Sequence, residues 1–388
     1  MRRALLVALA GIAVAGVARA ATTTVSTSIE QIRPDGSGHA VLETLAAQAD
    51  LLQVSDPEHV LLAEPSASGA TAVVLDRLSD GRRQVLGELA DRVVTASAHG
   101  DQAVAATCPA QGRCDSQLWL LRAGSAPRAF ANIDGEAGNP EQPGSGIVWS
   151  PDGRTLAVWS FVGCSYRGDS SDCNTFRLWL VSPTGGWVRP VGHHGRLASF
   201  SPDGRYLAYV GVVRGDPEDN VLVYDLRRGT IRRLGRGNIA AWSPKSDALA
   251  FGGLSTLRLF ANGAIRTLAG GVVPRTFGWS PNGRMIAFAC LCPPKTKRPR
   301  VAVLTLGGRS IRLAGPQADG IALIAWSPDS RRLAWVGAGP SATARVFAAT
   351  VGGRARPLLT TDENSTSVGP LWWSRAGDEI RFVFRRYS

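Results

Sequence analysis

The sequence predicts an all-β protein: a single β-propeller of eight four-stranded blades, with seven blades as the fallback. Three observations predict this fold. A short motif led by an aromatic residue recurs along the chain, each copy precedes runs rich in apolar and aromatic residues, and glycine makes up 44 of 388 residues. Abundant glycine is typical of chains with many tight turns. A repeat of about 45 residues is the length of a four-stranded propeller blade.

The recurring motif joins an aromatic residue to Ser-Pro-Asp-Gly or a close variant. The motif occurs in five clear copies and one worn last copy, spaced by 37 to 51 residues. Their aromatic residues are Trp149, Phe200, Trp242, Trp279, Trp326 and, in the worn copy, Trp373. Ser-Pro-Asp-Gly suits a type I turn, because proline presets the second φ angle and aspartate bonds back to the backbone. We expect the aromatic residue to end the innermost strand of a blade and to pack between neighbouring blades.

The segments after each motif are expected to supply the outer strands of the blade. The second strand follows the turn at once as a nearly continuous apolar run, as expected of a strand buried on both faces. Third strands are expected at residues 177–181, 220–226, 257–261, 300–306 and 344–351. The fourth strand is often basic, for example at residues 231–234, and charge on an outermost strand discourages edge-to-edge aggregation.

Both ends of the chain are expected to meet in one blade. Two fainter copies of the motif, at residues 54–57 and 96–101, bring the number of blade starts to eight. The last copy reaches Ser388 after only two strands, so its blade lacks an outer pair. Residues 23–32 and 40–45 have strand character and are expected to complete that blade as its outer pair. Such joining closes the ring and removes the free edges of an open sheet.

The repeat resembles the TolB-type β-propeller repeat over residues 145–384. Copies such as Trp149-Ser150-Pro151-Asp152-Gly153-Arg154 carry the resemblance. It implies the propeller fold but no single function, because that family includes binding scaffolds, accessory domains of peptidases and a few lyases. TolB itself has a separate α/β domain ahead of its propeller. In this chain the residues between the leader and the first blade are too few for one, so its partners are not carried over.

Residues 1–20 have the pattern of a secretory signal peptide, followed by a propeller over residues 21–388. Met1-Arg2-Arg3 gives a charged start, Ala4–Ala18 is apolar, and Ala18-Arg19-Ala20 is a small-x-small cleavage pattern. The apolar run is shorter than the roughly 20 residues that span a bilayer, and no later stretch approaches that length. We therefore expect an exported monomer, periplasmic or extracellular, with no transmembrane segment after cleavage.

The six cysteines form three local pairs. Cys108 with Cys114, and Cys164 with Cys173, are expected to be disulfides, since an exported protein meets an oxidising environment. Six cysteines allow 15 connectivities, but clustering favours neighbours, and the spacings lack the four ligands that zinc needs. Cys290 and Cys292 are only two positions apart, so a bridge between them would be strained and their pairing stays open.

Charged loops are expected to gather on the face that holds the loops between second and third strands. The candidate binding residues there are Asp169, Asp172, His193, His194, Asp216, Glu218, Asp219, Lys295, Lys297 and Arg298. The acidic loops are either solvated or calcium ligands, although no ordered ligand set is present. The basic loop is either solvated or steers an anionic partner. The adjacent histidines suggest a metal or acid–base site, but neighbouring side chains of an extended segment point opposite ways.

The function that these patterns favour is binding. The net charge of +12 hints at nucleic acid, but the basic residues are spread over the expected outer strands without aromatic interleaving. There is no nucleophile elbow and no phosphate-cradling loop, and no cofactor or metal is expected. The leading hypothesis is a non-catalytic exported propeller that binds an envelope protein or an anionic envelope polymer through its loop face. The alternatives are a metal-dependent lyase or hydrolase acting on a polysaccharide, and a structural role in an assembly.

Overall fold

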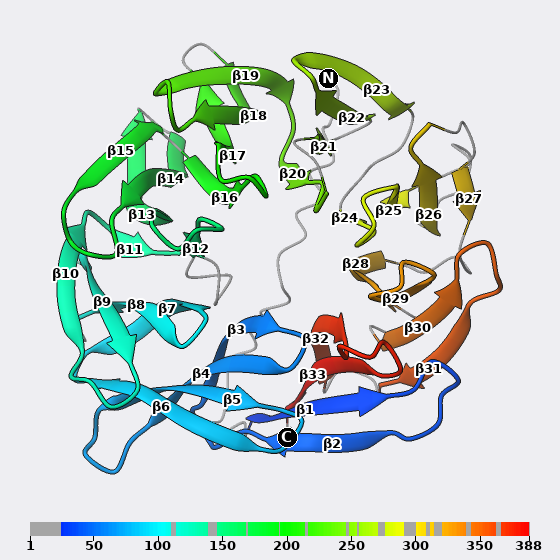
Figure 1. Ribbon diagram of the computed structural model, residues 1–388, viewed down its shortest axis with the longest axis horizontal. Helices are drawn as coiled ribbons and strands as arrows, with labels where there is room; N and C mark the ends of the chain where they lie inside the picture. The colour runs from blue at the N-terminus through cyan, green and yellow to red at the C-terminus, as the bar shows by residue number, and fades with distance from the viewer. Residues whose placement is uncertain are drawn as a thin grey trace.

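A computed structural model confirms the eight-bladed propeller. It describes residues 25–109, 114–138, 146–167, 170–193, 195–213, 216–245, 248–253, 256–270, 276–290, 300–307, 311–313, 320–338, 343–361 and 366–387. Eight antiparallel sheets stand around a common axis, each with its first strand nearest the centre (Figure 1). Within these ranges no helix is long and apolar enough to cross a membrane. The predicted leader lies outside the described residues.

The first four blades follow one another in chain order, and the strands of each run from the axis outwards. Blade 1 contains β3 (Asp50–Asp56), β4 (His59–Pro65), β5 (Thr71–Arg77) and β6 (Arg82–Leu89). Blade 2 contains β7 (Arg92–His99), β8 (Gln102–Cys108), β9 (Ser116–Arg122) and β10 (Arg128–Ile133). Blade 3 contains β11 (Glu136–Ala137) and β12 (Ile147–Trp149), which both pair with β13 (Leu156–Arg167), then β14 (Ser170–Val181) and β15 (Val188–His193). Blade 4 contains β16 (Gly195–Phe200), β17 (Tyr206–Val213), β18 (Asp216–Asp225) and β19 (Thr230–Arg236).

The remaining blades complete the ring. Blade 5 contains β20 (Ile239–Trp242), β21 (Leu249–Gly253), β22 (Thr256–Ala261) and β23 (Ala264–Gly270). Blade 6 contains β24 (Phe277–Trp279), β25 (Met285–Cys290), β26 (Arg300–Thr305) and β27 (Ile311–Leu313). Blade 7 contains β28 (Gly320–Trp326), β29 (Arg332–Ala338), β30 (Ala344–Thr350) and β31 (Arg356–Thr360). Blade 8 contains β32 (Thr366–Trp373), β33 (Ile380–Tyr387), β1 (Val25–Ile32) and β2 (Ala40–Thr44).

The two ends of the chain share blade 8, as the sequence predicted. β1 pairs with β33 in continuous antiparallel register from Val25 opposite Tyr387 to Ile32 opposite Ile380. Blade 8 is then joined to blade 1 by side chains: Arg381 Nη1 donates to Pro57 O at 2.8 Å and lies 2.9 Å from Glu58 Oε2. The last strand of the chain therefore touches both the first strand and the first complete blade.

The predicted motif turns form a repeated hydrogen-bond unit. In blade 4 the buried Ser201 Oγ accepts from Tyr206 N at 2.9 Å and donates to Asp203 Oδ1 at 2.6 Å. The same contacts occur at Ser150 and Ser327. The hydrogen bond from Ser150 is the main reason why the pKa of Asp152 lies below its ordinary value. The serine therefore fixes the turn from inside, where no water can replace it.

The motif tryptophans join neighbouring blades by a hydrogen bond as well as by packing. Each indole Nε1 donates to a carbonyl oxygen on the innermost strand of the preceding blade, at 2.9–3.2 Å. These pairs are Trp149 with Ser97, Trp242 with Ser199, Trp279 with Ala241, Trp326 with Gly278 and Trp373 with Ala325. Phe200 holds the same place in blade 4 and has no N–H group to donate.

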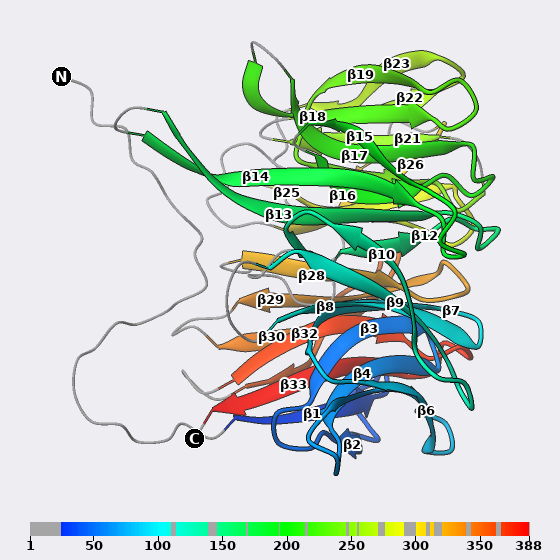
Figure 2. The same ribbon diagram turned by 90° about the vertical axis from the view of Figure 1, so that its left-hand side faces the viewer.

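The largest departure from the predicted strands lies in blade 3. A third strand was expected over residues 177–181, whereas β14 begins at Ser170 and pairs with an equally long β13. The two strands continue as a hairpin beyond the face of the ring (Figure 2). The prediction was too short because only the ring-buried part of the hairpin shows the apolar pattern of a propeller strand.

Replacing Trp279 by phenylalanine should remove one inter-blade hydrogen bond and keep most of the apolar packing. The carbonyl of Ala241 would lose its indole donor in a mostly buried place. We expect a loss of about 1–2 kcal/mol in the free energy of unfolding, measured by urea denaturation with an unchanged m-value. An unaltered denaturation midpoint would show that packing alone joins the blades.

Candidate functional site

The predicted acidic loop of blade 4 is neutralised by arginines. Both terminal guanidinium nitrogens of Arg196, Nη1 and Nη2, donate to the carboxylate of Asp219, at 3.1 and 2.7 Å. Asp216 forms ion pairs with Arg233 and, at 3.2 Å, with Arg236. Glu218 is exposed and donates its backbone N–H to Asp216 Oδ1. The carboxylates of Asp216 and Asp219 are therefore occupied by cations of their own blade.

The other predicted site residues cannot be joined to this loop. Five of them lie outside the described residues: Asp169, His194, Lys295, Lys297 and Arg298. Cys292 lies outside the described residues as well. Asp172 lies on β14 and His193 on β15, but their side chains are not described. In the described part of the chain, no three His, Cys, Asp or Glu side chains are placed to hold one metal ion. A histidine–aspartate site in blade 3 stays a prediction.

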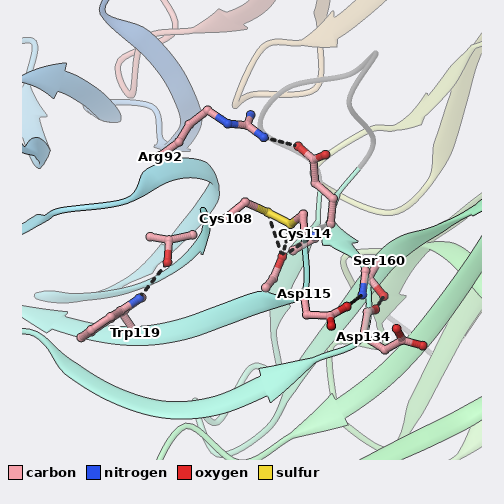
Figure 3. The surroundings of a disulfide bond; sticks show 12 residues. Arg92, Cys108, Cys114, Asp115, Trp119, Asp134 and Ser160 are labelled. Atoms are coloured by element: carbon pink, nitrogen blue, oxygen red, sulfur yellow. Dashed lines mark hydrogen bonds and ion pairs between the residues drawn. A yellow bond between two sulfur atoms is a disulfide. The ribbon is translucent and has the colours of Figure 1, made fainter. Parts of the chain in front are cut away.

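The first predicted disulfide is present. Cys108, at the end of β8, is bonded to Cys114, with the two Cα atoms 5.2 Å apart (Figure 3). Cys164 and Cys173 lie on β13 and β14 in the part of the hairpin whose side chains are not described, so their bridge stays a prediction. Cys290 is disulfide-bonded as well.

The Cys108–Cys114 disulfide lies beside a polar junction between blades 2 and 3. The buried Ser116 Oγ is 3.6 Å from each sulfur and accepts from Ala137 N of β11 at 2.8 Å. Gly135 N donates to Asp115 Oδ1 at 3.0 Å, and Arg92 pairs with Glu136 at 3.0 Å (Figure 3). The disulfide thus holds a loop whose next residues bind the neighbouring blade.

A groove that sequence reasoning missed lies on the opposite edge of the ring. It has a volume of about 370 Å³ and its lining residues all belong to blade 1: His59, Leu75, Arg77, Arg82, Arg83 and Gln84. β3 and β5 end at this edge, and β4 and β6 begin there. The edge is therefore the one that holds the motif turns, whereas the loop of Asp216 joins β17 to β18 at the other edge.

Strand register brings three basic side chains together in the groove. His59 is directly opposite Arg77, and Arg77 is directly opposite Arg82. Like charges in one cross-strand row repel each other unless anions lie between them. Asp56 compensates at His59, with 2.9 Å between Oδ2 and Nδ1, and Asp80 compensates at Arg77, 3.1 Å away.

Arg82 differs from its neighbours because its exposed guanidinium has no acidic partner among the described residues. Asp80, the nearest acid in sequence, receives only the backbone N–H of Arg82, at 3.1 Å, while its other oxygen faces Arg77. The free guanidinium therefore lies beside Arg77, and the imidazole of His59 lies on the other side of Arg77 in the same row. Little in the sequence indicated this groove, because blade 1 carries one of the two faint motif copies. The row of basic side chains follows only from the strand register.

The comparisons with known proteins concern the fold. No protein-family model and no curated protein matches the chain. A solved structure of two prolyl endopeptidases aligns with 93% of this chain and 54% of that chain, at 14% identity and a TM-score of 0.53. A putative TolB from Agrobacterium tumefaciens aligns with 94% of this chain and 99% of that chain, at 17% identity and a TM-score of 0.40. A puromycin-hydrolyzing peptidase of Mycobacterium tuberculosis aligns with 80% of this chain and 53% of that chain, at 14% identity and a TM-score of 0.48.

The match with the prolyl endopeptidases overturns one expectation from the sequence. A non-catalytic propeller that binds a protein or an envelope polymer through its loop face was the leading hypothesis, and it is wrong as an inference from this fold. The same fold, over nearly the whole of this chain, occurs in prolyl endopeptidases. A propeller architecture hosts binding proteins and enzymes alike, so the function has to be argued from a site.

Replacing Cys108 and Cys114 by serine should destabilise the chain through the loop that they close. The loop is short, with a sequence separation of 6, and loop-closure entropy gives an expected loss of about 2–3 kcal/mol in the free energy of unfolding. Urea denaturation of the purified variant and of the oxidised wild type provides the measurement. Equal free energies of unfolding would contradict a stabilising role for this bridge.

Proposed function

We propose that this chain is a ligand-binding propeller that recognises an oxyanion, a carboxylate or a phosphate group, in the groove of blade 1. The single observation that carries this proposal is the unpaired guanidinium of Arg82 at the end of the row formed with Arg77 and His59. An arginine presents several N–H donors in a fixed plane, which suits the oxygens of a carboxylate or phosphate.

The surroundings of the groove support one anion rather than a large charged polymer. Asp56 already bonds to His59, and Asp80 already pairs with Arg77. Asp56 also holds the imidazole of His59 through Nδ1, which leaves Nε2 for a further contact. Leu75 and Gln84, directly opposite each other, add an apolar wall and an amide. A ligand with one anionic group and a small apolar part matches this lining.

We also propose that the chain is exported. Two features support it: the charged start, apolar run and small-x-small pattern of residues 1–20, and the disulfide between Cys108 and Cys114, which is typical of oxidising compartments. The ligand of the groove would then be met outside the cytoplasm.

Arg82→Gln should weaken binding of an oxyanion by about tenfold, because it removes a charged hydrogen-bond donor at an exposed site. The probes are inorganic phosphate and succinate, titrated separately by isothermal calorimetry or by NMR shift at low salt. Binding of the wild type should weaken as ionic strength rises.

The matched control is Arg266→Gln, which removes the same charge from an exposed position on β23, outside the groove. Its affinity should equal that of the wild type. If both variants lose affinity equally, the anions respond only to net charge, and the groove is not a site. Saturation by succinate but not phosphate, or the reverse, identifies the chemical class of the ligand.

Expression of the full chain in an exporting bacterial host should release a protein that begins at Ala21. Cleavage after Ala20 follows from the small residues at positions 18 and 20. Intact-mass measurement of the released protein tests it, and Ala18→Leu with Ala20→Leu is the control that should block cleavage. Retention of Met1 in the exported wild type would contradict a cleaved leader.

A further inference from the structure

Two carboxyl groups meet at the junction between blade 8 and blade 1. Glu43 comes from β2, the outermost strand of blade 8, and Asp76 comes from β5 of blade 1. Asp76 is 2% exposed. Glu43 Oε2 and Asp76 Oδ1 are both buried, and neither accepts a hydrogen bond from any N–H or O–H of the described residues. Buried polar oxygens without a donor are rare and costly.

The groups around this pair do not supply the missing donor. From blade 1, Glu64 on β4 and Arg83 on β6 face the pair. Arg83 forms ion pairs with Glu64 and, at 3.5 Å, with Asp76, through nitrogens that leave Glu43 Oε2 and Asp76 Oδ1 unbonded. Three carboxyl groups therefore surround one guanidinium. Arg83 already places one cationic group among these oxygens.

A proton is the species that satisfies both oxygens at once. Protonated Glu43 donates to the ionised carboxylate of Asp76, which removes one negative charge from the cluster and leaves two carboxylates against Arg83. Strong hydrogen bonds of this kind form when one member of a buried carboxyl pair is neutral.

We propose that Glu43 and Asp76 share one proton, and that this proton fastens the outermost strand of blade 8 to blade 1. Loss of the proton leaves two adjacent buried carboxylates, which repel each other across the junction. β2 then keeps its pairing with β1, which shows a register shift between Ile29 and Glu30, and the apolar packing of Leu42. The contact between β2 and blade 1 therefore depends on pH. This inference is independent of the proposed groove.

The electrostatics of the pair give the pH range. Burial, followed by the hydrogen bond to Asp76 and its charge, raises the pKa of Glu43 to about 7, although Arg83 acts in the opposite direction. The folded chain therefore binds this proton more tightly than the unfolded chain does. Its stabilising contribution is complete below the ordinary glutamate value of 4.5 and is lost as pH rises through about 7. The lowered pKa of turn aspartates such as Asp152 acts only at lower pH.

Hydrogen exchange of the β2 amides tests the fastening directly. Exchange is followed by mass spectrometry at about pH 6 and about pH 8.5 and corrected for the intrinsic chemical rate. In the wild type, the corrected exchange of residues 40–44 should accelerate by about tenfold or more at the higher pH, since about one pKa unit corresponds to tenfold. Glu43→Gln keeps a donor at this place without a charge, so its β2 exchange should stay slow at both pH values.

Glu218→Gln is the matched control: Glu218 is exposed on β18, and its variant should retain the wild-type response. Wild-type β2 exchange that does not change with pH, or an equal change in Glu43→Gln, overturns the proposal. If Glu43→Gln fails to fold, infrared titration of the wild type decides it. A protonated carboxyl band that disappears as pH rises through about 7 supports the shared proton, and its absence at about pH 6 overturns it.

Discussion

The pairing of β1 with β33 is the contact on which the rest of this structure depends. A propeller blade buries both faces against its neighbours, so every blade needs two partners and an open ring would expose two sheet faces at once. In this chain the first and last strands lie side by side over their full lengths, and blade 8 exists only because of that pairing. Neighbouring blades otherwise follow one another along the chain, and the two ends of the chain meet within blade 8.

The interface between blade 8 and blade 1 combines apolar packing with buried polar groups. Ile29 and Val383 of blade 8 pack with Val60 and Leu62 of blade 1, and Trp372 Nε1 donates to Pro57 O at 3.3 Å. Between blade 8 and blade 1 lie Arg381, which is 6% exposed, Glu58, and the carboxyl pair of Glu43 and Asp76. Buried charged groups are costly unless they are paired, but they also specify a single arrangement. Polar contacts between blade 8 and blade 1 suit the place where the ring closes, because the two ends of the chain have to pair in a single register there.

The propeller architecture could be predicted from the sequence, whereas the groove of blade 1 and the buried carboxyl pair could not. Turn residues such as those around Ser150 and the aromatic residues before them act locally, so blade number, strand order and the completion of blade 8 by residues near both ends could all be predicted. The row of His59, Arg77 and Arg82 and the pair of Glu43 and Asp76 depend on which residues face each other across strands and blades. Cross-strand register is not local information, and a shift of one residue sends each side chain to the other face. The Cys108–Cys114 bridge could be predicted because its partners are neighbours in the chain.

Phe200 makes one contact between neighbouring blades different from the others. At the interface of blades 3 and 4 the place of the indole is taken by a phenyl ring, and Arg196 lies over the ring of Phe176 instead, 5.8 Å from its centre. At the interface of blades 1 and 2 the side chain comes from the earlier blade and the backbone group from the later one: Gln53 Oε1 accepts from Ala98 N at 2.8 Å. Apolar packing is non-directional, so at the repeat of Phe200 the motif residue fills the space between two blades without fixing their lateral position through a backbone hydrogen bond.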